Sequence, residues 1–266
     1  MRRIAVIVWL VAAAATVSAQ HQPGNGAPLM PWPTLEASGH GRFFFGSGDL
    51  TGMLEYRGQY DLDRANVLYN SFTLGGYYRV HPNVKIGAFY RLQFGARHDD
   101  DWINTGSEWI WRDTSLRPEH IAMVDVTPRF LMDFLPGENW VFSVKNRYEA
   151  TMYEQDASFY FLQSLMVRPG ITFFYLRNRE PVFNVSLQYG SYWSLNFGEV
   201  PWYSHGPYVN FLYHLSPGLQ LDASVGAKFI YWDESADFDA AWPNNTYAVQ
   251  VYQPFSVDIG VIYQMR

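Results

Sequence analysis

The chain contains no cysteine among its 266 residues, which excludes disulfide bonds, thiol catalysis and cysteine-ligated metal sites. Charged residues are also scarce, at 17% of the chain against about 25% in a typical soluble domain. Beyond the N-terminus no run of 18 apolar residues occurs, so a helical membrane protein is not expected. The net charge of −6 and the lack of a basic run argue against nucleic-acid binding.

The chain is rich in aromatic side chains and in stretches where apolar residues alternate with small or polar ones. Phe, Tyr and Trp together reach 18%. Over residues 247–265 every second residue is mostly apolar, and the residues between them are mostly small or polar. This period of two predicts a β-strand, and its length far exceeds the roughly 5–6 residues of an ordinary strand. Such a strand fits a transmembrane barrel, with lipid on one face and a polar lumen on the other.

The N-terminal part differs from the rest in composition. Residues 1–19 predict a secretory signal peptide, because Arg2 and Arg3 precede an apolar core that ends in small residues up to Ala19. Residues 20–40 are rich in Pro and Gly without periodicity, so we expect a flexible periplasmic tail there. Residues 41–266 should then form one domain, a β-barrel in the outer membrane of a Gram-negative bacterium.

The predicted fold is all-β: an antiparallel transmembrane β-barrel of about ten strands. Tight connections rich in turn residues alternate with longer ones, as periplasmic turns alternate with extracellular loops in outer-membrane barrels. An even strand number places both termini in the periplasm. The strands are expected near 50–62, 66–80, 84–97, 119–135, 139–153, 157–178, 181–197, 207–215, 219–233 and 247–265.

Three prolines lie inside predicted strands: Pro128, Pro169 and Pro254. Because proline cannot donate to the ladder, each should mark a bulge. A turn at residues 167–170 would instead give eleven strands and leave a segment of seven residues, too short to cross a bilayer. We therefore expect one long strand through Pro169.

Alternation also assigns charged side chains to the lumen. Their signs nearly balance, and barrels of about eight strands are filled by side chains, so we expect ion pairs across the lumen. Asp258 on the last strand should meet Arg57, because the last strand closes against the first. The predicted lumen network is Glu55, Arg57, Arg79, Lys85, Arg91, Asp125, Arg129, Asp133, Lys145, Arg147, Glu149, Arg168, Asp222, Lys228 and Asp258.

The predicted extracellular loops are rich in tryptophan and carboxylates. These side chains fit a glycan or small-molecule ligand, or cations that bridge lipopolysaccharide; alternatively they form an aromatic girdle and solvated loop charges. We expect no resident metal and no cofactor. The candidate contacts are Trp102, Glu108, Trp109, Trp111, Asp237, Asp239 and Trp242.

Two stretches resemble features of outer-membrane barrels. The end of the chain, from Asp258 through Gly260 and Tyr263 to Met265, resembles their C-terminal signal, although Arg266 follows it. That resemblance implies recognition by the outer-membrane assembly machinery. A wider set of motifs resembles a family of small proteobacterial outer-membrane β-barrels of unknown function, which implies a location and no activity. These motifs are Gly75-Gly-Tyr-Tyr-Arg79, Arg117-Pro-Glu119-His120, Arg168-Pro169-Gly170 and Leu195-Asn-Phe197.

One further motif resembles a family of enzymes. Asp99-Asp-Asp101-Trp102 is similar to the Asp-x-Asp-Trp of omptins, which are ten-stranded outer-membrane proteases. The Asp-x-His pair of that family is absent, and His205 has only Glu199 near it in sequence. A rim-located hydrolase using Asp99, Asp101 and His205 is therefore an alternative, as is a surface glycan binder. We expect a porin-like, non-enzymatic barrel that contacts outer-membrane lipids and lipopolysaccharide and acts in structure, ligand binding or limited passage of small solutes.

Overall fold

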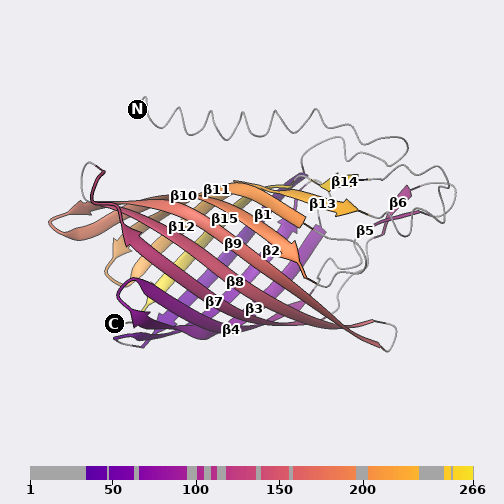
Figure 1. The fold of residues 1–266 in the computed structure, drawn as a ribbon, viewed down its shortest axis with the longest axis horizontal. Coiled ribbons are helices and arrows are strands. Elements are labelled where there is room, and N and C mark those ends of the chain that lie inside the picture. Colours follow the sequence, from indigo (N-terminus) through magenta and orange to yellow (C-terminus); the bar gives the residue numbers. More distant parts are fainter. Residues whose placement is uncertain are drawn as a thin grey trace, which may run out of the picture.

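The computed structural model describes residues 34–46, 48–62, 66–94, 101–104, 109–112, 118–135, 139–155, 158–195, 203–233, 249–252 and 254–265 (Figure 1). All regular secondary structure in these ranges is β. No helix there is long and apolar enough to cross a bilayer. The strands are β1 (Thr34–Phe45), β2 (Leu50–Asp61), β3 (Asn66–His81), β4 (Val84–Phe94), β5 (Asp101–Asn104), β6 (Trp109–Arg112), β7 (Glu119–Leu131), β8 (Trp140–Gln155), β9 (Ser158–Arg177), β10 (Glu180–Ser194), β11 (Tyr203–Ser216), β12 (Leu219–Ala227), β13 (Phe229–Asp233), β14 (Val249–Tyr252) and β15 (Pro254–Gln264).

Eleven of these strands close a barrel. The ladder runs β10-β9-β8-β7-β4-β3-β2-β1-β15-β12-β11, and pairing of β10 with β11 completes the ring. β13 and β14 extend one end of β11, while β5 and β6 form a separate hairpin. The prediction of an all-β barrel is confirmed. The prediction of ten strands is wrong, because β1 adds a strand before the first one expected.

Strand β1 occupies residues that were assigned largely to the N-terminal tail. Its inward positions are polar, as at His40 and Arg42, whereas its outward positions include Gly39 and Gly41. Apolar residues such as Leu35 and Phe43 stand only at the two ends of the outward face, and the two glycines interrupt it in the middle, so the alternation is weak in the sequence. Pairing with β2 on one side and β15 on the other leaves no exposed strand edge in the ring.

The odd strand number makes β1 and β15 parallel. Thr34 pairs with Pro254 and Phe44 with Gln264, so Thr34 lies at the opposite end of the barrel from Met265. We call the end that holds Met265 and the tight turns the turn end, and the other the loop end. We expected both termini at the same end of the barrel. The first described residue of β1 lies instead at the opposite end from Met265, and the residues before it lie outside the described ranges.

One tight turn has the backbone that a two-residue type I′ hairpin requires. Asn178 and Arg179, which join β9 to β10, have φ of 54° and 66°. Two consecutive left-handed residues are characteristic of a type I′ turn, whose twist matches that of the flanking strands. This hairpin fixes the register of β9 and β10 at the turn end.

The prolines affect the ladder differently from the predicted bulges. β9 is continuous over 20 residues, as expected, and the same register with β10 holds on both sides of Pro169. The register also holds across Pro128. Pro254 begins β15, so the long alternating stretch at the end of the chain forms two strands, β14 and β15. Proline without an N–H interrupts single ladder bonds here and shifts no register.

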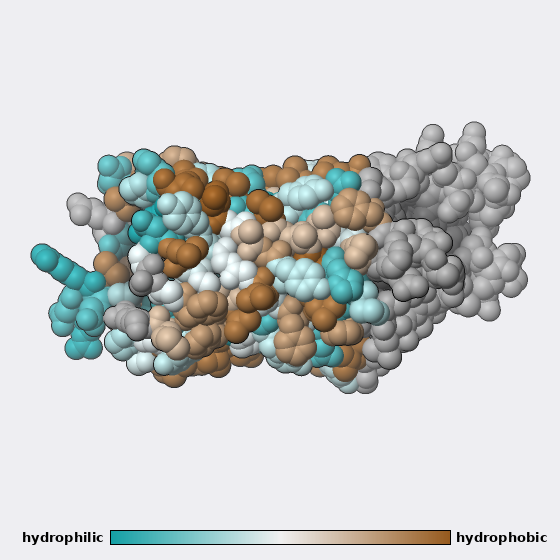
Figure 2. Space-filling model, turned by 90° about the horizontal axis from the view of Figure 1, so that it is seen from below, coloured by the Kyte–Doolittle hydropathy of each residue, from teal (hydrophilic) through white to brown (hydrophobic). Residues whose placement is uncertain are grey.

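The outer wall of the barrel is an apolar band, visible in the middle of Figure 2, with hydrophilic residues gathered at the turn end on the left. Large apolar side chains such as Leu74, Val124 and Ile259 are about half exposed there. Stacked aromatic pairs lie towards the turn end, including Phe43 with Tyr263. This alternation of an apolar outside with a polar inside follows directly from the period of two.

A repeated hydrogen bond lies within the band towards the loop end, and exposed apolar side chains such as Met152 and Phe161 continue beyond it. Four times, a tyrosine hydroxyl bonds to a polar side chain two residues beyond its ladder partner, towards the loop end. We call this set the tyrosine ring. Diagonal neighbours on one face of a sheet are within reach of long side chains. The pairs are Tyr56–Asn70 (2.8 Å), Tyr90–His120 (2.5 Å), Tyr148–Gln163 (2.8 Å) and Tyr189–His205 (2.5 Å).

Candidate functional site

The interior of the barrel holds a cavity of about 750 Å³. Inward side chains from nearly every strand of the ring line it, and they are predominantly polar. Cations outnumber carboxylates among the described residues that line it. The cations are Arg42, Arg57, Lys85, Arg129, Lys145, Arg168 and Lys228, and the carboxylates are Glu36, Asp222 and Asp258.

One side of the lumen is dominated by His40 of β1. Its side chain is fully buried, with Nδ1 3.1 Å from Asp258 and Nε2 3.3 Å from Asp222. Gly260 is the ladder partner of His40 on β15, and a Cβ there would lie 2.3 Å from the imidazole. The ring therefore lies directly against the β15 backbone, and only glycine fits beneath it.

The two carboxylates that flank His40 have other donors as well. Ser38 donates to Asp258 at 2.6 Å, and Nη2 of Arg57 lies 3.1 Å from the same carboxylate. Asn210 donates to Asp222 at 2.5 Å. We call these residues, with His40, the seam cluster, because they join β1, β2, β11, β12 and β15. Buried charges held by several partners in this way rigidify their surroundings.

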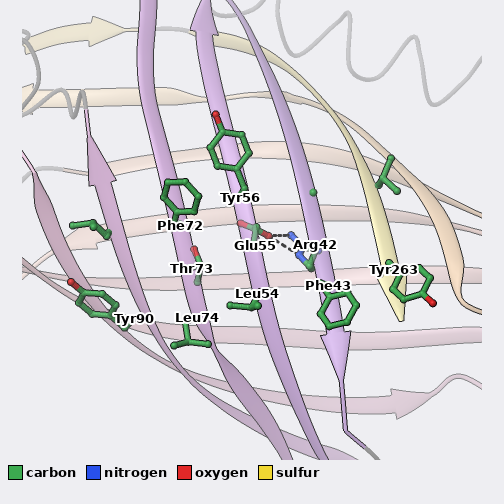
Figure 3. Close-up of a pocket in the computed structure, with 13 residues that line it drawn as sticks. Arg42, Phe43, Leu54, Glu55, Tyr56, Phe72, Thr73, Leu74, Tyr90 and Tyr263 are labelled. Carbon is green, nitrogen blue, oxygen red and sulfur yellow. Dashed lines mark hydrogen bonds and ion pairs between the residues drawn. The ribbon is translucent and has the colours of Figure 1, made fainter. Parts of the chain in front are cut away.

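Beside the seam cluster, Arg42 and Glu55 form an ion pair between β1 and β2 (Figure 3). Nε of Arg42 donates to Glu55 at 2.6 Å, and the carboxylate is only 6% exposed. A second buried network lies on β7 and β8, where Asp125 is fully buried. Arg147 donates to both of its oxygens at 2.5 and 2.9 Å, and Lys145 lies 3.0 Å away. Each of these carboxylates thus has a guanidinium within hydrogen-bond distance.

Arg168 on β9 has a different environment. Its guanidinium donates to the hydroxyl of Tyr192 and lies 4.7 Å above the ring of Tyr208. Nε of Arg168 is buried and has no hydrogen-bond partner among the described residues. Lys145 is its ladder partner on β8, and Nζ of Lys228 lies 5.1 Å from the Tyr192 ring. We call these five residues the cation–tyrosine cluster.

The structure places most of the predicted lumen residues on the inner wall, but two lie elsewhere. Arg79 is 60% exposed at the turn end, 4.0 Å from the exposed Asp49. Asp133 is exposed in the turn after β7, because β7 ends at Leu131. The sequence interpretation missed His40 and Arg42 because it assigned His40 to the tail and began the first strand after Arg42. It turned Tyr192 inward but gave it no role.

The predicted loop residues are described only in part. The backbones of Trp102 and Trp111 pair in the β5–β6 hairpin, as does that of Trp109 with Asn104; their side chains lie outside what the structure describes. Asp99, Glu108, Asp237, Asp239 and Trp242 lie outside the described ranges altogether, and of Asp101 only the backbone is described.

His205, the candidate base of the hydrolase alternative, lies on the outer wall in β11. Its Nδ1 is 2.5 Å from the hydroxyl of Tyr189, and its ring lies 5.4 Å from that of Phe229. A base must reach the proton that it abstracts, and this ring is held by its neighbours in the tyrosine ring. No observation on the described residues favours the hydrolase over a non-enzymatic barrel.

A groove of about 620 Å³ also lies on the outer wall, next to Gly41 of β1 (Figure 3). Its lining is almost entirely apolar and aromatic, with Phe43, Tyr56, Phe72 and Tyr263 around it. A Cβ at Gly41 would meet no atom within 4 Å. The groove therefore belongs to the apolar band and offers no catalytic group.

No group of three or more histidines and carboxylates is arranged to hold a metal ion within the described ranges. Comparisons with known proteins add no family: no protein-family model matches the chain, and no curated protein matches it.

Proposed function

We propose that this protein is an integral outer-membrane β-barrel of a Gram-negative bacterium, non-enzymatic, whose lumen binds small anionic solutes and allows their limited passage. One observation carries the solute class: seven cations and three carboxylates line the cavity, among the residues that the structure describes. A surplus of one sign along a lumen is what charge-selective pores use.

Three features support the membrane location. The outer wall is a band of exposed apolar side chains, with the tyrosine ring towards the loop end and aromatic pairs near the turn end. Bands of this kind with aromatic borders are typical of barrels in lipid. The predicted signal peptide and the C-terminal signal at Tyr263 and Met265 point the same way.

The carboxylates that line the cavity are already bound to protein donors, which favours an anion over a cation as the solute. Asp222 and Asp258 are both bound to His40 and to further donors, so they offer a cation little free capacity. In contrast, Arg168 faces the cavity without a carboxylate partner among the described residues. The charges that line the cavity therefore have a positive surplus.

In the proposed orientation, the turn end faces the periplasm and the loop end faces outwards, as in other outer-membrane barrels. β15 would be the strand that the assembly machinery recognises. Outer-membrane lipids would cover the apolar band, with acyl chains filling the groove beside Gly41, and lipopolysaccharide headgroups would meet the tyrosine ring.

Planar-bilayer recording with the full chain tests the proposal. Folded protein, recognised by a heat-dependent shift in gel mobility, should give small conductance steps. Under a KCl gradient the reversal potential should have the sign of anion selectivity. Arg179→Gln, at an exposed turn, serves as the control and should leave selectivity unchanged. Folded protein that gives no steps contradicts the passage of solutes, and a cation-selective reversal potential contradicts the solute class.

A further inference from the structure

We infer that the cation–tyrosine cluster is a binding site for an oxyanion group, a carboxylate or phosphate, of a small solute, and that Arg168 is its central donor. The inference deepens the proposed function and rests on it for the solute class. It concerns one saturable site on β8, β9, β10, β11 and β12, whereas the proposed function concerns the charge of the whole lumen.

The partners of Arg168 give the first argument. Arg42 has Glu55 and Arg147 has Asp125, whereas the side-chain partners of Arg168 within the described ranges are tyrosines alone. A guanidinium out of water needs a counter-charge and partners for its donors. Tyrosine hydroxyls and rings supply hydrogen bonding and weak cation–π attraction, but no full negative charge. An anion in the adjoining cavity completes the set.

The buried donor gives the second argument. Nε of Arg168 has no partner among the described residues although it is shielded from solvent, and nearly all such groups in proteins are hydrogen-bonded. Arg168 itself lines the cavity, so an oxygen that enters the cavity can accept from its guanidinium. Arginine binds carboxylate and phosphate oxygens more strongly than neutral acceptors.

The close packing around this donor gives the third argument. Gly190 on β10 has no side chain, and a Cβ there would lie 3.4 Å from Nε of Arg168 and 3.0 Å from the Tyr208 ring, so a glycine is what lets the guanidinium and the ring occupy this part of the wall. A Cβ at Gly170 would likewise lie 2.7 Å from the side chain of Gln188. The guanidinium is therefore held in one position at the edge of the cavity, and a donor that is fixed before a ligand arrives binds it at a lower entropic cost.

The neighbouring cations select the ligand class. Lys145 is the ladder partner of Arg168, and Nζ of Lys228 lies 5.1 Å from the centre of the Tyr192 ring. Lys145 is partly neutralised by Asp125 at 3.0 Å. Together they favour a group with a full negative charge over a neutral sugar or amide, because attraction between opposite charges is strong where water is scarce. A carboxylate and a phosphate both meet this requirement.

Calorimetric titration of the full chain in detergent tests the site, with sodium acetate and sodium phosphate as the two probes at constant ionic strength. Wild type should bind at least one probe saturably. Arg168→Gln should weaken that binding by about tenfold or more, as expected for loss of a charge-assisted bond. Lys85→Gln is the matched control, because it removes the same charge from the same cavity at another strand; it should change the affinity by less than about twofold.

Gly190→Ala provides a second variant should Arg168→Gln fail to fold. It keeps every charge, and its Cβ would press on the Tyr208 ring at 3.0 Å and on Nε of Arg168 at 3.4 Å, so it should shift the guanidinium and also weaken binding. Equal affinity in wild type and both variants overturns the inference, and so does an equal loss in Lys85→Gln, which would indicate diffuse lumen charge. Anion-selective conductance without saturable binding overturns the site and leaves the proposed function standing. Saturable binding without conductance overturns the passage of solutes and leaves the binding site standing.

Discussion

Nη2 of Arg57 lies 3.1 Å from Oδ2 of Asp258 although a whole strand separates them. Arg57 is on β2, Asp258 is on β15, and β1 runs between these strands. The guanidinium reaches over β1 on the lumen side, where Ser38 and His40 hold the same carboxylate. The sequence correctly paired these two charges but wrongly made their strands neighbours.

Replacement of His40 by alanine should destabilise the barrel by about 3–5 kcal/mol, because Asp222 and Asp258 would lose a fully buried partner. Urea unfolding in detergent, followed by tryptophan fluorescence, measures the change. Asp49→Ala breaks an exposed ion pair and should shift stability by about 0.5 kcal/mol or less. Equal effects of the two substitutions would contradict a stabilising role for the seam cluster.

Gly260→Ala should cost about 1–3 kcal/mol, since its Cβ would meet the His40 ring at 2.3 Å. The same substitution in a His40→Ala background should cost markedly less, because the obstructing ring is gone, and a double-mutant cycle measures this coupling. Gly41→Ala on the outer wall adds a methyl group where no atom lies within 4 Å. It serves as the control and should be nearly neutral. Additive costs for Gly260 and His40 would refute the packing described.

An arginine scan along the outer wall of β7 should locate the membrane boundary. Val124 lies in the apolar band and His120 in the tyrosine ring. If lipid covers the band, Val124→Arg should cost about 2–4 kcal/mol and His120→Arg about 0–1 kcal/mol. Refolding equilibria in lipid vesicles give both values. Similar losses of stability at Val124 and His120 would contradict a membrane boundary at the tyrosine ring.

The parallel seam can be tested by cross-linking, because the chain has no cysteine of its own. Ala37 and Val257 are ladder partners on β1 and β15, so Ala37→Cys with Val257→Cys should form a disulfide. Tyr60→Cys with Val257→Cys joins β2 to β15 at the same level, because Tyr60 is the ladder partner of Ala37 on β2, and it should not form a disulfide, since β1 separates the two strands. Non-reducing gels and mass spectrometry distinguish the two cases. A cross-link in the second pair alone would indicate that β2 pairs directly with β15, as in a ten-stranded barrel.

The sequence determined most of the ring because its strands alternate strongly. On β4, Ile86, Ala88 and Tyr90 are exposed while Gly87 and Phe89 are buried, the two faces that alternation predicts. Strand β1 was not predicted because Gly39 and Gly41, in the middle of its outward face, carry no hydrophobic signal. The displacement of Asp133 arose from placing the end of β7 too late, and strand ends depend on turn geometry more than on alternation.

The candidate site was predictable only in part, for a related reason. Alternation turned Arg168 towards the lumen, but it could not show that Arg168 lacks a carboxylate partner. Partners across a barrel depend on how far each strand is displaced along the next, a three-dimensional property that no single strand encodes. The seam cluster likewise needs β1 in place before His40 meets Asp222 and Asp258.

The parallel contact between β1 and β15 also bears on how such a fold arises. Barrels that gain or lose whole hairpins change their strand number by two and so keep its parity. If this ring descends from an even-numbered ancestor, a single strand must have been added or removed at some point. A single strand can join such a ring without reversing the others only at one end of the chain, so the change of parity lies at β1 or at β15, the two strands that meet in parallel.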